Sequence, residues 1–372
     1  MNPEEHRWNC SIVVQFRSVV ETIINKKYLV CVRCYTYNQS QYINDTLNGF
    51  VMQQTSFPFV CTIVDDASND GEQETIKRFL EDNFELHDFS VAYEKDADYG
   101  HVTFAQNKTN KNCYFVVIYL KENHYSKKKG KARYLIEWND AKYMALCEGD
   151  DYWTDPLKLQ KQVDYLEKHE DCCMCCHATD WKTNDVVYKQ GCQHEFSCDL
   201  TTEEIIRNGG LYVATNSLVY RSWIKDDRPE WRVKSSVGDF PLKILGTLRG
   251  KMHFLPDVMG VYRYMREGSW TANHDGSVQM DQSISLNYAK NKVLWLNLLD
   301  KDTDYKYTGV IYSHLFRYYN VLFNAKEIGF SEYYRAARKA DEKHTKRVFR
   351  DFMIRYLSPF HKIWLHLVGK TK

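Results

Sequence analysis

Apolar runs rich in β-branched and aromatic residues alternate with stretches of helical periodicity along the first 170 residues. The runs predict β-strands, and the stretches between them, with apolar residues three or four positions apart, predict helices. The predicted strands are 28–34, 57–64, 89–94, 113–121 and 142–148, and the predicted helices are 37–54, 71–84 and 155–170. This alternation is typical of an α/β fold in which helices cover both faces of a mostly parallel sheet.

The pattern changes after residue 176. Two further predicted strands, 211–221 and 251–265, flank a predicted helix at 238–248. From about Ser277 onward the periodicity predicts only helices, at 283–299, 309–326, 331–344 and 345–368. We therefore expect three parts, which are an N-terminal arm (1–27), one α/β domain (28–270) and a helical C-terminal region with a basic tail (271–372).

Charge is unevenly distributed along the chain. The formal net charge of the 372 residues is only +1, so nucleic acid is not an expected partner. From Arg335 to Lys372, however, eleven Lys and Arg stand against three Asp and Glu. Bases alternate there with apolar residues, which suits either an interfacial helix on anionic lipid or a helix packed on the protein with a solvated basic face. A second basic run, 123–133, is either a solvated loop or a contact for an anionic ligand.

The cysteines and the N-terminus indicate a reducing compartment. The chain has 12 cysteines, and its first residues, MNPEEHRWNC, lack the apolar core of a secretion signal. No stretch approaches 18 consecutive apolar residues, so no transmembrane helix is expected. We expect a cytoplasmic protein, in contact with the membrane at most as a peripheral protein on its cytoplasmic face.

One cysteine cluster could hold zinc. Cys172, Cys173, Cys175, Cys176 and His177 lie within six positions. Structural zinc sites usually combine two spaced half-sites, and only 191–198 offers a second one. Cysteine is also a small residue that is often buried, so we favour a core strand for this segment.

Two of the predicted strands end in carboxylates. Asp65 and Asp66 follow the run at 57–64, and Glu148, Asp150 and Asp151 follow the run at 142–148. In open α/β sheets, ligands bind beyond the carboxyl ends of the strands. Carboxylates at this place bind a hard cation, transfer protons or accept hydrogen bonds from a ribose or base. A solvated turn is the alternative, but two such clusters favour a ligand site.

Three stretches resemble one known family. Residues 37–54, 63–71 (IVDDASNDG) and 142–167 (KYMALCEGDDYWTDPLKLQKQVDYLE), followed by GDFPL at 238–242, resemble the family 2 glycosyltransferases. The similarity spans about residues 28–270 and is greatest to bacterial members that build surface polysaccharides. It implies the GT-A fold, a Rossmann-like, mostly parallel mixed sheet flanked by helices.

The resemblance also implies an activity. Such an enzyme transfers a hexosyl or N-acetylhexosaminyl group, with inversion, from a nucleoside-diphosphate sugar, here expected to be UDP-linked. The acceptor is a hydroxyl of a growing surface glycan or lipid-linked glycan. The cofactor is Mn²⁺ or Mg²⁺, and residues 28–270 would be the catalytic domain.

By the same resemblance, the acid clusters hold the donor. Asp66 accepts a hydrogen bond from the base, Asp65 supports it, and Tyr37 lies near the base. Asp150 and Asp151 face the ribose, the diphosphate and the metal, with Asp151 as the first choice for a direct ligand.

Further roles follow from the later matching segments. Glu148 stands where many members have Asp, and it either binds through water or supports the turn. Asp239 is implied as the catalytic base, although the sequence alone also indicates a helix N-cap. Arg263, Ser269 and Trp270 match a loop that closes over the diphosphate or acceptor, but the His and paired glycines of many members are replaced here by MREGS.

Two other functions compete with this interpretation. A nucleotidyltransferase that makes sugar nucleotides would normally have a glycine-rich loop after its first strand, and residues 34–42 contain no glycine. A catalytically inactive nucleotide-sugar-binding protein would not need the four carboxylates Asp66, Asp150, Asp151 and Asp239. We therefore place both behind the glycosyltransferase.

Overall fold

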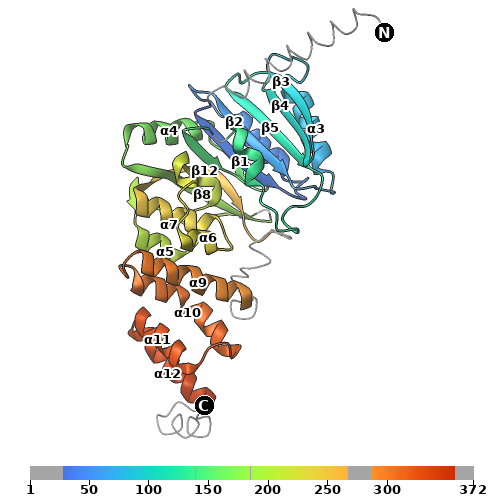
Figure 1. Ribbon diagram of the computed structural model, residues 1–372. Coiled ribbons are helices and arrows are strands. Elements are labelled where there is room, and N and C mark those ends of the chain that lie inside the picture. Colours follow the sequence, from blue (N-terminus) through green and yellow to red (C-terminus); the bar gives the residue numbers. More distant parts are fainter. Residues whose placement is uncertain (1–27, 139, 185, 267–285, 357–372) are drawn as a thin grey trace, which may run out of the picture. The chain divides into compact units, whose positions relative to one another are not determined.

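The structure is a computed structural model that describes residues 28–138, 140–184, 186–266 and 286–356 (Figure 1). The expected arm at 1–27 lies outside the described residues. The chain divides into two compact units. The first unit comprises the chain up to residue 200 together with 213–226 and 246–263, and the second comprises 201–212, 227–245 and the chain from 264 onward.

The described part of the first unit contains one mixed sheet of twelve strands, ten of which follow the order β10-β12-β8-β11-β6-β1-β2-β5-β4-β3. The two remaining strands are β7, which pairs with β12, and β9, which pairs with β8. The strands are β1 (Val30–Thr36), β2 (Phe59–Asp65), β3 (Ala92–Ala97), β4 (Gly100–Gln106), β5 (Cys113–Leu120), β6 (Tyr143–Leu146), β7 (Tyr152–Trp153), β8 (Cys172–Thr183), β9 (Val186–Lys189), β10 (Cys198–Leu200), β11 (Val219–Arg221) and β12 (Lys251–Arg263).

The middle of this sheet is parallel. Strand β1 pairs in parallel with β2 on one side and with β6 on the other, and β2 pairs in parallel with β5. Antiparallel neighbours flank this block, with β4 on β5 and β11 on β6. The carboxyl ends of β6, β1, β2 and β5 therefore meet at one edge of the sheet.

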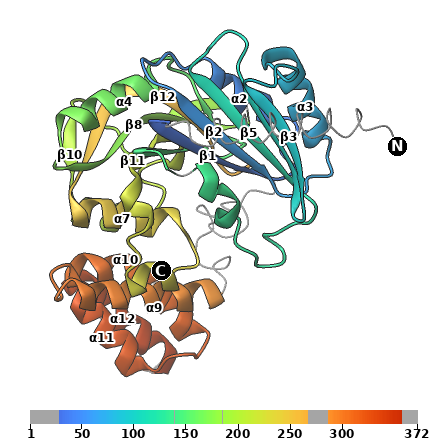
Figure 2. The same ribbon diagram turned by 45° about the horizontal axis from the view of Figure 1, so that its top comes forward.

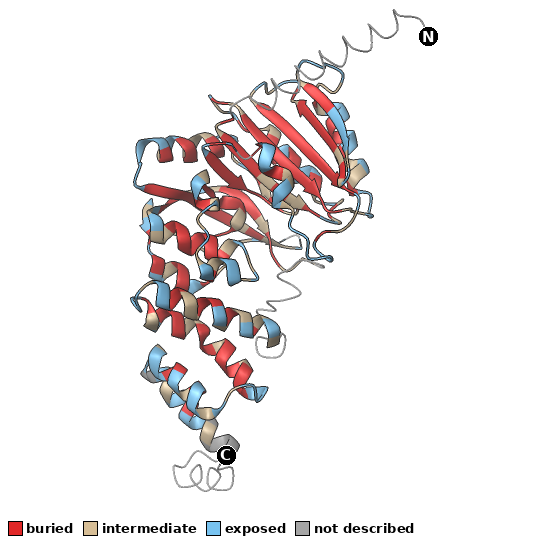
Figure 3. Cartoon of the chain, in the orientation of Figure 1, coloured by how far each residue is buried: buried red, intermediate tan, exposed pale blue. Residues whose placement is uncertain are grey.

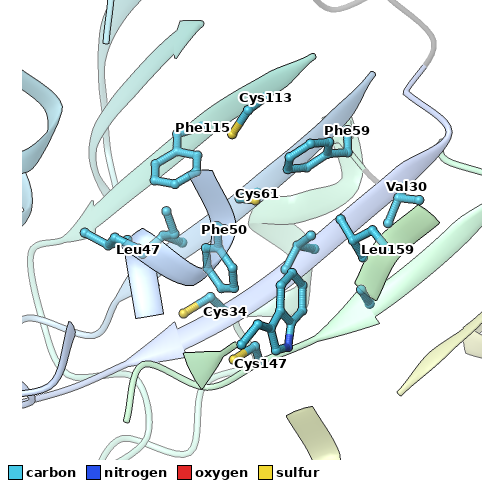
Figure 4. Close-up of a cluster of buried hydrophobic side chains, with 14 of the residues drawn as sticks. Val30, Cys34, Leu47, Phe50, Phe59, Cys61, Cys113, Phe115, Cys147 and Leu159 are labelled. Carbon is cyan, nitrogen blue, oxygen red and sulfur yellow. The ribbon is translucent and has the colours of Figure 1, made fainter. Parts of the chain in front are cut away.

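The central strands are buried on both faces. Every residue of β2 and of β5 is buried, as the red strands of Figure 3 show. Because neighbouring residues of a strand point to opposite faces, such continuous apolar runs need cover on both sides. One face carries a core of Phe59, Phe115 and Phe50, whose rings lie together in Figure 4.

Helices supply the cover on the face of that core. They are α2 (Ile43–Val51), α3 (Glu72–Asn83) and α4 (Lys158–Lys168), and each contributes side chains to the same buried cluster (Figure 2). On the opposite face, Trp138 of the 3₁₀ segment η1 (Ala132–Trp138) stacks on Phe104 of β4 with 5.3 Å between ring centroids. The predicted fold, a mixed sheet flanked by helices with helices at the C-terminus, is confirmed.

The second unit is helical where it is described. Its helices are α5 (Thr202–Asn208), α6 (Glu230–Lys234), the first residues of α7 (Asp239–Arg249), α9 (Leu286–Asp302), α10 (Thr308–Asn324), α11 (Phe330–Ala340) and α12 (Glu342–Tyr356). The buried Trp295 of α9 packs against Trp231 and Phe240, at centroid distances of 6.4 and 5.5 Å. In the described part of the chain, no helix is both long and apolar enough to span a membrane.

The cysteine cluster lies within a strand. Cys172, Cys173, Cys175 and Cys176 all belong to β8 and are buried, so the predicted core strand is confirmed. Burial raises the pKa of Cys176 well above its usual value, which keeps the thiol protonated. Within the described ranges, no group of three or more His, Cys, Asp or Glu is placed to hold a metal ion, so these thiols are not gathered into a zinc site there.

Candidate active site

The turn after β6 carries three carboxylates and is fixed from several sides. Within it, Asp151 N donates to the Glu148 carbonyl oxygen at 3.1 Å. The Thr46 hydroxyl of α2 donates to the carbonyl oxygens of Gly149 and Asp151, at 2.9 and 2.6 Å. Glu148 Oε2 accepts from Tyr35 N at 3.2 Å. We call residues 147–151 the acid turn.

Glycine is required within the acid turn. A Cβ atom on Gly149 would lie 2.6 Å from Thr36 Cβ, with the Thr36 hydroxyl and the Gln39 amide oxygen nearer still. Real Cβ atoms do not approach neighbours this closely. The acid turn is therefore pressed directly against the connection between β1 and α2, where Tyr37 lies.

Asp151 is held almost out of contact with solvent. Asp151 is 2% exposed, and its Oδ1 accepts from Arg263 N of β12 at 2.9 Å. Burial, followed by the charge of Asp150, raises the pKa of Asp151 well above its usual value. Burial also raises the pKa of Glu148, with Asp150 adding to it and Arg33 opposing it. Both carboxyl groups are therefore harder to ionise here than they would be in water.

These carboxylates fit a divalent cation of the Mg²⁺ type, which needs few ligands from the protein. Mg²⁺ and similar ions often bind through one or two carboxylates and complete their shell with substrate phosphates. Asp150 and Asp151 are adjacent. Burial and then the charge of Asp150 raise the pKa of Asp151, and a bound cation would favour its ionised form. In the described ranges no group of three or more His, Cys, Asp or Glu is arranged to hold a metal, so a cage built from protein alone does not form there.

Arg263, which the resemblance places near the diphosphate, lies on the acid turn. Its Nη1 donates to the Asp150 carbonyl oxygen at 2.5 Å, and its Nη2 forms an ion pair with Asp45 of α2. Ser269 and Trp270, expected beside it, lie outside the described residues.

Asp66 follows β2 and is completely buried. Its Oδ1 accepts from His124 N at 2.6 Å, and its Oδ2 accepts from Tyr125 N and from Lys131 Nζ, both at 3.0 Å. The basic run predicted at 123–133 is therefore anchored on Asp66. Lys131 Nζ also lies 4.9 Å from the centre of the Tyr35 ring.

Asp65 ends β2 and is equally buried. Its Oδ1 accepts from Ser68 N at 3.2 Å and from Gln73 Nε2 at 2.5 Å, whereas its Oδ2 is buried and has no hydrogen-bond partner among the described residues. Burial raises the pKa of Asp65. Tyr37, one residue beyond β1, is 43% exposed and is available to a ligand.

The two acid clusters share one edge of the sheet. Strand β1 lies between β6 and β2, so the strand ends that carry the clusters are two spacings apart, or about 10 Å. Tyr35 and Thr36 at the end of β1 lie between them.

Asp239 belongs to the second unit and begins α7. Its Oδ2 accepts from Lys243 Nζ at 2.8 Å, one helical turn along, and Lys243 Nζ also donates to the Gly210 carbonyl oxygen at 2.7 Å. Burial alone would raise the pKa of Asp239, but Lys243 and Lys292 outweigh burial, and the pKa is lowered. The carboxylate is thus kept ionised.

Sequence reasoning missed a buried carboxylate beside the loops after β1 and β2. Glu72, at the start of α3, accepts from Gln39 N at 2.9 Å, from the Ser68 hydroxyl at 2.8 Å and from the Thr36 hydroxyl. It connects the loops that follow β1 and β2. Its place in the sequence indicates only an acidic first turn of a helix, so nothing in the local pattern marks it.

Comparison with known proteins gives two kinds of similarity. No family model matches the chain. It is 30% identical over 241 residues to the uncharacterized protein Rv1520 of Mycobacterium tuberculosis and to the uncharacterized protein Mb1547 of Mycobacterium bovis. The match covers 63% of this chain and 58% of each relative, so the chain spans little more than half the length of these relatives.

Solved structures are similar in fold. S. aureus TarS 1–349, in complex with UDP-GlcNAc, aligns over 88% of this chain and 81% of its own, with a TM-score of 0.50 and 17% identity. Mannosyltransferase PcManGT from Pyrobaculum calidifontis, solved with GDP-Man and Mn²⁺, covers 85% of this chain and 83% of its own at 12% identity. Its TM-score of 0.45 is too low for its metal to be carried over to this chain. The similarity to TarS shows that the two proteins share a fold.

Proposed function

We propose that this protein is a glycosyltransferase that transfers a sugar from a nucleoside-diphosphate sugar to a hydroxyl group. The observation that carries the proposal is the acid turn with its buried Asp151 at the carboxyl end of β6, on the edge that also carries Asp65 and Asp66. The fold is that of a protein solved with UDP-GlcNAc, which supports a nucleotide-sugar ligand at this edge. The motifs at 37–54, 63–71 and 142–167 support membership of family 2.

The donor is proposed to be UDP-linked. Asp66 would accept a hydrogen bond from the base, with Asp65 behind it and the exposed Tyr37 beside the ring. Asp66 already accepts from residues 124, 125 and 131, which leaves Oδ1 with one lone pair for the base. Glu148 is proposed to support the acid turn through its bond with Tyr35 N.

Asp150 and Asp151 are the residues that would hold Mn²⁺ or Mg²⁺. When bound, such an ion acts as a Lewis acid on the diphosphate leaving group. The chain's own contribution is to keep both carboxylates in the acid turn, with Asp151 oriented by Arg263 N.

Asp239 is proposed as the base of an inverting transfer. The acceptor oxygen attacks the anomeric carbon, the bond from that carbon to the diphosphate oxygen breaks, and Asp239 takes the hydroxyl proton. Lys243 and Lys292 lower the pKa of Asp239, so the carboxylate is ready to accept the proton at neutral pH. The group transferred would be a hexosyl or N-acetylhexosaminyl unit.

The acceptor is proposed to be a growing surface glycan on a lipid carrier, at the cytoplasmic face of a membrane. Helices α11 and α12 carry exposed bases that suit an anionic lipid surface, namely Arg335, Arg338, Lys343, Lys346 and Arg350. In this proposal residues 28–270 form the catalytic domain and residues 271–372 bring it to its acceptor.

A donor panel tests the proposal. Purified protein is mixed with UDP-, GDP- and dTDP-sugars, with Mn²⁺ or with EDTA, and nucleotide release and thermal stabilisation are measured. We expect metal-dependent release of UDP from one donor and its loss in Asp151→Asn. Asp164→Asn, an exposed acid on α4, is the matched control and should behave as wild type. Binding of a donor without turnover in the presence of any acceptor would instead favour the inactive binding protein, and absence of both would refute the proposal.

A further inference from the structure

Arg263 ends β12 and joins three segments that are far apart in the sequence. Its backbone N donates to Asp151 Oδ1 at 2.9 Å, its Nη1 donates to the Asp150 carbonyl oxygen at 2.5 Å, and its Nη2 pairs with Asp45 of α2. We propose that Arg263 is a positioning residue that holds the acid turn in the arrangement needed to bind the metal and diphosphate of the donor. This inference rests on the proposed function of the acid turn.

The surroundings of the guanidinium fix its plane. It lies between two aromatic rings, with its central carbon 4.8 Å from the centre of the Tyr42 ring and 4.6 Å from that of Tyr152. Arg263 is only 7% exposed. A planar fork that stacks on rings and donates in two directions is specific to arginine, because lysine offers a compact charge on a flexible stem.

The position of the charge explains why the acid turn needs this residue. Asp151 is buried beside Asp150 and Glu148, and like charges at such short range repel. The positive charge of Arg263 opposes that repulsion and, through its backbone and side chain together, restrains both residues of the Asp150–Asp151 pair. The guanidinium is already engaged by groups of the protein, so we assign it a role on the acid turn and not on the diphosphate.

Substitution of Arg263 by lysine is the central test. We expect Arg263→Lys to weaken the binding of UDP in the presence of Mn²⁺ by about tenfold or more, measured by isothermal titration calorimetry. The unfolding temperature of the same variant in EDTA without nucleotide should stay close to that of wild type. Asp45→Asn removes only the ion pair to a half-exposed carboxylate, which is 54% exposed, and should change binding by less than about threefold.

A double-mutant cycle separates positioning from direct contact. If Arg263 acts through the acid turn, Arg263→Lys adds little further loss of UDP·Mn²⁺ binding in an Asp151→Asn background. If Arg263 contacts the diphosphate itself, the two losses add, and our inference is wrong. If Arg263→Lys binds UDP·Mn²⁺ as tightly as the wild-type protein does, the inference about Arg263 is wrong and the proposed function still stands. If the wild-type protein itself binds no nucleotide, the proposed function is wrong.

Discussion

Lys158 is a lysine enclosed in the core, and its substitution makes a quantitative test of the structure. It begins α4, has no exposed surface, donates to Gln162 Oε1 at 2.7 Å and lies 4.2 Å from the centre of the Trp153 ring. Burial lowers the pKa of Lys158 from 10.5 to about 7. The protonated form is therefore disfavoured in the folded state relative to the unfolded state.

The magnitude follows from the pKa difference. One pKa unit corresponds to about 1.4 kcal/mol, so the fully protonated lysine costs the folded state about 5 kcal/mol. Well below pH 7 both states carry the proton and this cost is complete. As the pH rises above 7, the folded state releases the proton while the unfolded state keeps it until about pH 10.5, so stability increases. Between pH 7 and 8.5 the gain is about 2 kcal/mol.

The assay compares wild type with Lys158→Met by urea unfolding at several pH values from 7 to 8.5. At pH 7 we expect the free energy of unfolding of Lys158→Met to exceed that of wild type. At pH 8.5 this difference between the two proteins should be about 2 kcal/mol smaller. Lys161→Met is the matched control, because its ion pair with Asp155 raises the pKa of Lys161 and leaves it charged throughout this range. A difference between wild type and Lys158→Met that does not change with pH would refute the reasoning.

Three further predictions concern the edge of the sheet and Asp239. Lys131→Ala should speed tryptic cleavage of the loop at 123–131 severalfold, because the loop loses an anchor on the acid cluster after β2; an unchanged cleavage rate would contradict that anchoring. Gly149→Ala should lower stability by about 1–3 kcal/mol through overpacking, whereas Gly130→Ala, with no atom near its Cβ position, should leave the melting temperature nearly unchanged. Asp239→Asn should reduce transfer by about a hundredfold or more while donor binding is retained, and normal turnover by this variant would exclude Asp239 as the base. Lys243→Met should move the acidic limb of the pH–rate profile to higher pH, because Lys243 lowers the pKa of Asp239.

The parallel centre of the sheet could be predicted because its strands are buried on both faces. Such strands read as continuous apolar runs, and β2 and β5 fall within one residue or two of the predicted ranges. Strand β4, Gly100–Gln106, was missed because its pairing with β3 and β5 is not visible in its own residues. The predicted strand at 211–221 is reduced to Val219–Arg221, since the residues before it form a short 3₁₀ turn at Thr215–Ser217.

For the site, the sequence predicted which strand ends carry acids but not what those acids contact. The contact between Arg263 and Asp151 joins residues 112 positions apart, and no local periodicity encodes such a distance. The same holds for Asp66 and Lys131, which are 65 positions apart. The roles assigned to Asp66, Asp151 and Asp239 stay predictions.

The buried cysteines allow local unfolding of the sheet to be measured by thiol labelling. Burial raises the pKa values of Cys34, Cys61, Cys147 and Cys176 well above the ordinary value, so the reactive thiolate is scarce while the sheet is intact. An aromatic disulfide such as Ellman's reagent would therefore modify them only in molecules whose sheet has transiently separated. The labelling rate at each sulfur then measures how often that part of the sheet opens, without any engineered probe. Cys147 belongs to the acid turn, and Cys61 lies in the strand that leads to Asp66. The labelling rates of these two cysteines therefore report local unfolding at each of the two acid clusters separately.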